Sequence, residues 1–116
     1  MSFTLATWNI NSVRLREALV SKLLAEESPD VLCLQEIKSP VDKMPVEAFH
    51  ALGYRHIVAR GQKGYNGVAI LSKLPIMDAG DRDFANLGHA RHVAAQLENG
   101  VTIHNFYVPA GGDIPD

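Results

Sequence analysis

The sequence predicts an α/β fold in which a mixed β-sheet carries helices packed on one face. In the first half of the chain, short apolar runs of strand length alternate with segments whose apolar residues recur at helical spacing. In the second half, several strand-like segments follow one another. The order β-α-β-α followed by strands is typical of layered α/β domains. The chain of 116 residues is long enough for one domain and carries no internal repeat.

The first expected unit is a strand, a helix and a second strand. A strand is expected over residues 3–10 and a helix over 13–27, where leucine and alanine recur on one helical face. Ser12 is the expected N-cap of this helix, and Pro29 marks its end. The short apolar run at 31–35 is typical of a buried strand.

Further elements are expected after residue 40. A second helix near 44–52 should end at Gly53, in the position of a C-cap glycine. The dipeptide Asn99-Gly100 predicts a hairpin between the last two strands. The expected strands lie near 54–59, 66–72, 91–97 and 101–108.

Composition excludes several classes of protein. The formal net charge is −2, from 11 basic and 13 acidic residues, so any attraction to nucleic acid must come from local positive charge. The single cysteine, Cys33, lies in an apolar run and is expected to be a buried small side chain, in a reducing compartment. The first residues contain neither a signal peptide nor a membrane span, so the expected location is cytoplasmic, with no membrane partner.

Polar residues end the first two strands. Asn9 closes the first, and Glu36 follows the second. A right-handed crossover makes these strands parallel, which brings both carboxyl ends to the sheet edge where ligands bind in α/β proteins. A carboxylate beside an amide suits part of a Mg²⁺ site. From these residues alone, a helix cap at 11–12 and a solvated Glu36 remain the simpler interpretation.

Four motifs together resemble the exonuclease III family of AP endonucleases. They are Thr-Trp-Asn-Ile-Asn-Ser-Val-Arg at 7–14, Leu-Gln-Glu-Ile-Lys at 34–38, the glycine-rich segment 61–71, and Asn-Phe-Tyr-Val-Pro at 105–109. They occur in the order of the family and span nearly the whole chain. Each motif alone is weak evidence, but the combination is specific.

The resemblance implies a Mg²⁺-dependent hydrolase, with Mn²⁺ as an alternative, whose substrate is duplex DNA with abasic sites or 3′ ends. It implies that Glu36 binds the metal and that Asn9 lies beside the metal and the scissile phosphate. Tyr107 would contact the phosphate and stabilise its developing charge. Without the resemblance, Tyr107 would be an aromatic residue at a strand end, half in the core.

The resemblance also implies a DNA-binding surface. The segment 61–67 is similar to a turn that faces DNA in the family, and Arg60, Lys63 and Asn66 are the expected phosphate contacts there. Arg91 matches a family arginine, although Ala90 stands where a second arginine can occur. A solvated β-turn is the alternative interpretation of 61–67.

The chain departs from the family because the motifs of the family's later half are absent. These include the residues that activate water, the remaining metal ligands and an Asp-His pair. We therefore expect residues 1–116 to be the truncated N-terminal portion of one domain, the first half of a four-layer α/β sandwich in which roughly the second sheet is absent. Strands 66–71 and 101–106 would then be exposed, and the fragment would self-associate through the uncovered sheet face. The alternatives are a phosphoesterase of lipid or inositol phosphates and a non-catalytic fragment.

Overall fold

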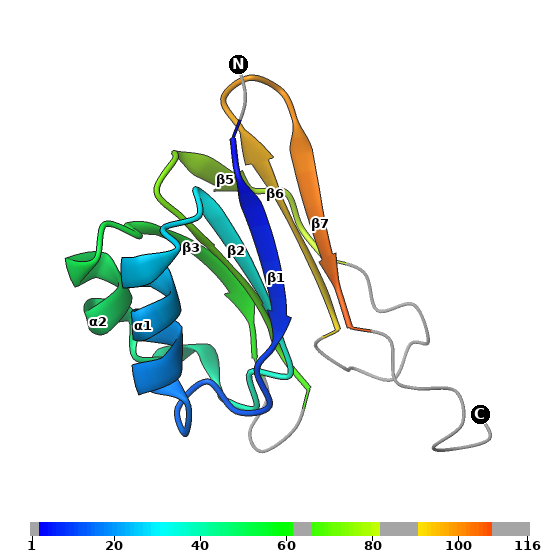
Figure 1. The fold of residues 1–116 in the computed structure, drawn as a ribbon. Helices are drawn as coiled ribbons and strands as arrows, with labels where there is room; N and C mark the ends of the chain where they lie inside the picture. The colour runs from blue at the N-terminus through cyan, green and yellow to red at the C-terminus, as the bar shows by residue number, and fades with distance from the viewer. Residues whose placement is uncertain (1–2, 62–65, 82–90, 108–116) are drawn as a thin grey trace.

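Two β-sheets and one layer of helices form the part of the chain that the structure, a computed structural model, describes: residues 3–61, 66–81 and 91–107 (Figure 1). The elements in chain order are β1 (Leu5–Asn9), α1 (Glu17–Glu26), β2 (Val31–Gln35), the 3₁₀-helix η1 (Val41–Lys43), α2 (Val46–Ala51), β3 (His56–Arg60), β4 (Val68–Ser72), β5 (Ile76–Asp78), β6 (His92–Leu97) and β7 (Thr102–Phe106).

The first sheet is mixed, as predicted. Its strand order is β1-β2-β4-β3, with β1 and β2 parallel and the other two pairs antiparallel. Both α-helices cover the same face of this sheet (Figure 1). A core of fully buried side chains lies between the helices and the sheet, and it includes Phe49, Tyr54, Leu24 and Leu34. These contacts confirm an α/β fold with helices on one face of a mixed sheet.

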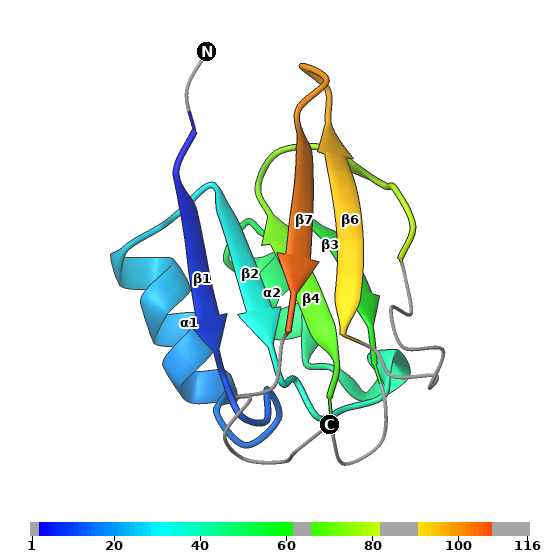
Figure 2. The ribbon, with the colours of Figure 1, turned by 90° about the vertical axis from the view of Figure 1, so that its right-hand side faces the viewer.

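The second sheet, of order β5-β6-β7, covers the opposite face of the first sheet (Figure 2). A second apolar cluster fills the space between the sheets, with Cys33 and Ile70 from one side and Val93 and Ile103 from the other. Burial raises the pKa of the Cys33 thiol to about 11, which fits a packed side chain and not a reactive thiolate.

This second sheet corrects the expectation that strand 66–71 is exposed. All five residues of β4 are buried, because helices cover one face of the strand and the three-stranded sheet covers the other. The expectation for 101–106 was half right. In β7, Ile103 and Asn105 are buried against the first sheet, whereas Thr102, His104 and Phe106 are exposed.

Two surfaces stay open among the described residues. No described helix or strand lies over the outer face of the three-stranded sheet, and no described strand pairs with the outer edge of β1 (Figures 1 and 2). Leu5 is 54% exposed and Phe106 is 46% exposed, so apolar area remains on both surfaces. Self-association through the uncovered sheet face stays a prediction. No helix among the described residues is long and apolar enough to cross a membrane.

The helix α1 begins four residues later than expected. The N-cap position is Arg16, and Ser12 has a positive φ of 88°, so Ser12 is not the cap. Residues 12 and 13 instead donate backbone hydrogen bonds to Glu36 (2.8 Å) and Ile37 (2.9 Å). This tertiary pairing overrides the helical pattern of the sequence. By contrast, α2 ends just before Gly53, whose φ is 99°, as predicted.

Candidate active site at one end of the sandwich

The carboxyl ends of β1 and β2 lie side by side at one edge of the first sheet (Figure 1). The last pair of their parallel register joins Asn9 to Gln35, and Glu36 is the next residue. Asn9 is exposed and Glu36 is half-buried. The predicted parallel pairing and common edge are confirmed. The metal-binding role of Asn9 and Glu36 remains a prediction.

The turns at this end hold a strained backbone. Six non-glycine residues among those described have a positive φ, and only Ser28 lies elsewhere. Such conformations cost about 1–3 kcal/mol each and cluster at functional sites. The five at this end are Asn11 (50°), Ser12 (88°), Glu36 (54°), Lys38 (51°) and Asn66 (56°).

Backbone hydrogen bonds from both sides hold the Glu36 turn. Its carbonyl accepts from the Ser12 amide at 2.8 Å, while the Lys38 amide donates to the Asn66 carbonyl at 2.8 Å. Position 67, next to this turn, requires glycine. A Cβ at Gly67 would collide with the side chain of Ile37, and the φ angle of Gly67 is 97°. The turns after β1 and β2 and before β4 therefore form one connected unit around Glu36.

The second sheet brings Arg91 and Tyr107 to the same end. Arg91 and Tyr107 face each other just beyond the paired residues of β6 and β7. The Tyr107 amide donates to the Arg91 carbonyl at 2.7 Å. Tyr107 packs against the cluster between the sheets. By strand alternation, Arg91 points to the same side as Val93, toward the first sheet. The Arg91 Nε is buried and has no hydrogen-bond partner among the described residues.

A network of side-chain hydrogen bonds, buried at Asn105 and exposed at Thr7, crosses between the sheets next to these residues. The Asn105 side chain donates to the Leu34 carbonyl at 2.9 Å and the Ala69 carbonyl at 2.8 Å. The Gln35 side-chain amide donates to Asn105 Oδ1 at 2.7 Å and to Thr7 Oγ1 at 2.9 Å. No role for Thr7, Gln35 or Asn105 was predicted from the sequence. One sequence feature could have indicated Asn105: it is a polar residue at a position where the alternation of β7 places side chains in the core.

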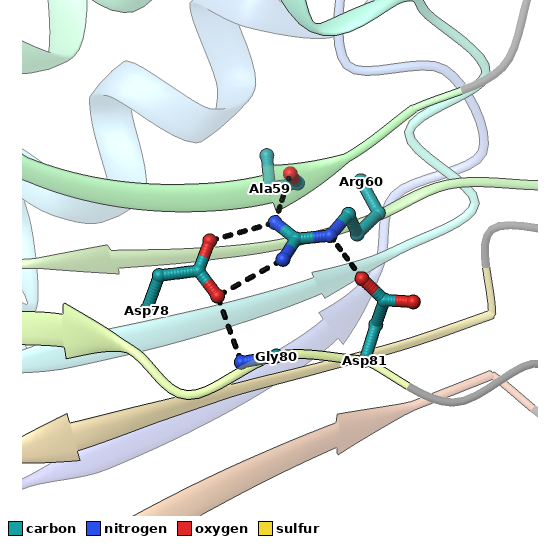
Figure 3. A network of polar contacts seen from close by, with 5 residues as sticks. All are labelled: Ala59, Arg60, Asp78, Gly80 and Asp81. Atoms are coloured by element: carbon teal, nitrogen blue, oxygen red, sulfur yellow. Dashed lines mark hydrogen bonds and ion pairs between the residues drawn. The ribbon is translucent and has the colours of Figure 1, made fainter.

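Arg60 was expected to contact DNA, but in the structure its guanidinium is already paired with two carboxylates (Figure 3). Its guanidinium pairs with both carboxylate oxygens of Asp78 at 2.9 Å, and its Nε lies 2.5 Å from Asp81 Oδ2. This hydrogen bonding to Asp78 raises the pKa of Arg60 and lowers that of Asp78. Arg60 therefore links β3 to β5, and a DNA phosphate would compete with two carboxylates. Lys63 lies outside the described residues.

We expect Asp78→Asn to destabilise the protein at neutral pH but not in acid. The folded-state pKa of Asp78 is below its usual 3.8, so its contribution is present above that value and is lost as pH falls through the lowered pKa. The Asp78 side chain is 48% exposed, so the expected loss is at most about 1 kcal/mol. Urea unfolding at about pH 7 and at the lowest pH at which the chain stays folded measures it.

Asp42→Asn is the matched control, because Asp42 is exposed and has no ion pair among the described residues. Equal losses of stability from Asp78→Asn at both pH values would contradict an ionic role for Asp78.

The fold and the position of the candidate residues define a layered α/β protein with a polar site at one end of two packed sheets. Residues 6–115 match the model of the Endonuclease/Exonuclease/phosphatase family, and the chain belongs to this family.

Individual relatives agree with this assignment. Exodeoxyribonuclease III of Haemophilus influenzae is 34% identical over 110 residues, covering 90% of this chain and 41% of the relative. A 3′ phosphatase from Neisseria, bound to a product DNA hairpin, matches with a TM-score of 0.83 and 38% identity, covering 98% of this chain and 45% of the other. An AP endonuclease from Archaeoglobus fulgidus gives a TM-score of 0.83 and 38% identity, with 93% and 42% covered. The chain therefore spans less than half the length of these relatives.

Proposed function

We propose that the polypeptide containing this chain is a Mg²⁺-dependent phosphodiester hydrolase of DNA repair, which cuts duplex DNA at abasic sites and removes 3′-terminal nucleotides. The observation that supports it is the meeting of four strand ends, which carry Asn9, Glu36, Arg91 and Tyr107, at one end of the sandwich. In this proposal, residues 1–116 are the N-terminal portion of one catalytic domain.

The donor set fits Mg²⁺ as a partial site. The described residues contain no group of three or more His, Cys, Asp or Glu side chains that could hold a metal. Glu36 and Asn9 would supply one carboxylate and one amide oxygen, which suits Mg²⁺ because it keeps several waters and also binds substrate phosphate. Mn²⁺ accepts the same oxygen ligands. The ion, when bound, would polarise the phosphoryl oxygen and stabilise the leaving oxygen.

The other side chains would bind and orient the substrate. Tyr107 would donate a hydrogen bond from its hydroxyl to a non-bridging oxygen of the scissile phosphate, where negative charge develops. Asn9 would orient the same phosphate. Arg91 would hold the flanking backbone, with Lys63, Arg60 and Asn66 as further candidates, of which Asn66 is only 8% exposed. We propose that the group that activates the attacking water lies outside residues 1–116.

Three substrates distinguish this proposal from its rivals. We expect the purified polypeptide to cleave an abasic-site duplex and to shorten a 3′-recessed duplex with Mg²⁺, and to do neither with a chelator. Hydrolysis of a phosphoinositide without DNA cleavage would favour a lipid or inositol phosphoesterase instead. Metal-independent DNA binding with no hydrolysis of any substrate would favour a non-catalytic module.

A further inference from the structure

We propose that Asn105 is a positioning residue of this site: its buried amide sets the second sheet, which carries Tyr107, against the strand ends that carry Asn9 and Glu36. The inference rests on the proposed function and adds to it a residue that determines how the two halves of the site meet.

The amide nitrogen and the amide oxygen of the Asn105 side chain both form hydrogen bonds to the first sheet. Asn105 lies on β7 and is 2% exposed. Both protons of its amide nitrogen are donated, to Leu34 and Ala69 carbonyls of the first sheet, and its oxygen accepts from Gln35. Leu34 and Ala69 face each other in the β2–β4 register, which is why one amide reaches both. A buried amide with these partners has one favourable orientation.

Hydrogen bonds can define the alignment of the sheets in a way that the surrounding apolar contacts do not. The cluster between the sheets contains mainly small aliphatic side chains such as Val31, Val68 and Ala95. Their burial is favourable but not directional, so it tolerates small shifts of one sheet over the other. Hydrogen bonds of 2.7–2.9 Å weaken steeply with displacement. The Asn105 amide therefore holds β7 at one place over β2 and β4.

Each side chain of the network lies next to a proposed site residue. Asn105 lies two residues before Tyr107, which directly follows β7, and Thr7 lies two residues before Asn9 on the same face of β1. Gln35 immediately precedes Glu36. Tyr107 comes from the second sheet, whereas Asn9 and Glu36 come from the first. Any slip between the sheets would therefore change the distance from the Tyr107 hydroxyl to the phosphate held at Glu36.

The test compares two substitutions at Asn105 in the purified polypeptide. Asn105→Leu keeps the approximate volume and removes every hydrogen bond. Asn105→Asp keeps an acceptor oxygen but removes both N–H donors. A carboxylate oxygen would then face the two carbonyl oxygens that the amide nitrogen contacted. We expect kcat for abasic-site cleavage to fall at least about tenfold in both, with KM changed less than about threefold, because a displacement of about 1 Å can cost ~100-fold in rate.

The pH profile separates positioning from simple loss of stability. A carboxyl group in this buried place should have a raised pKa, and its protonated form regains one donor. In Asn105→Asp we expect kcat relative to the unsubstituted protein to recover as pH is lowered, whereas in Asn105→Leu the ratio stays constant. Rates are measured where denaturant unfolding shows each variant to be folded. Asn99→Asp, in the exposed β6–β7 turn, is the matched control and should leave kcat unchanged.

A second readout on the 116-residue chain needs no catalysis. In ¹H–¹⁵N NMR spectra, Asn105→Leu should shift the backbone amides of Tyr107 and Glu36, and Asn99→Asp should shift neither. If no DNA substrate is cut, the proposed function fails while this comparison still decides the structural inference. A folded Asn105→Leu variant with kcat within about twofold of the original, or with unshifted Tyr107 and Glu36 amides, would overturn it.

Discussion

Glu36→Gln should slow the chemical step by about 100-fold or more while changing DNA affinity little. The substitution removes the charge of the proposed metal ligand, and the loss of about 3 kcal/mol of transition-state stabilisation corresponds to this factor. Most DNA affinity should come from phosphate contacts by other residues. Glutamine also preserves the length of the side chain at a residue with φ of 54°, where the backbone is already strained.

Single-turnover rates across a Mg²⁺ titration measure this effect, and DNA dissociation constants at one fixed salt concentration complete the comparison. The variant should need more Mg²⁺ for its half-maximal rate. Glu47→Gln is the matched control, because Glu47 is exposed on α2, on the helix-covered face of the first sheet. Equal losses of DNA affinity and turnover in Glu36→Gln would show that Glu36 has a structural role.

The second large effect concerns residues 1–116 alone. We expect this chain to show no measurable cleavage of an abasic-site duplex, even with ample Mg²⁺. Catalytic groups that act as a unit are strongly non-additive, so Asn9, Glu36 and Tyr107 without a water-activating group should give little rate. A fluorescent abasic-site assay measures this directly, with the AP endonuclease from A. fulgidus as positive control. An active, monomeric chain would show that the catalytic residues have been misassigned.

Light scattering on the same preparation addresses self-association. Because β4 is buried, the expected contact is the outer face of the three-stranded sheet, where Phe106 is 46% exposed. Phe106→Ser should then lower the apparent mass, since it removes an exposed aromatic ring from that face. An unchanged mass distribution would indicate that association, if present, uses another surface such as the edge of β1.

Local sequence patterns predicted the part of the fold that depends on neighbouring residues and on chain handedness. The apolar run at 31–35, the end of the second helix before Gly53 and the parallel pairing of the first two strands follow from periodicity, glycine geometry and the right-handed crossover. These same rules place Asn9 and Glu36 at one edge. The resemblance to the family further indicated Tyr107 and Arg91, although strand patterns alone did not show which sheet carries them.

Contacts between distant residues decided the rest. Whether Arg60 is free for DNA depends on Asp78 and Asp81, which lie 18 and 21 residues away. The strand β5 has three residues, too few for a recognisable alternation, so the packing of the second sheet was not foreseen.

The sequence by itself determined the α/β class, the parallel β1–β2 unit and the candidate residues at its edge, because these depend on local periodicity and handedness. Only the tertiary structure decided that a second sheet buries β4 and that Asn105 bonds to Leu34, 71 residues away. The physical reason is that hydrogen bonds between sheets depend on where separate segments meet after folding, and no local pattern encodes that meeting point.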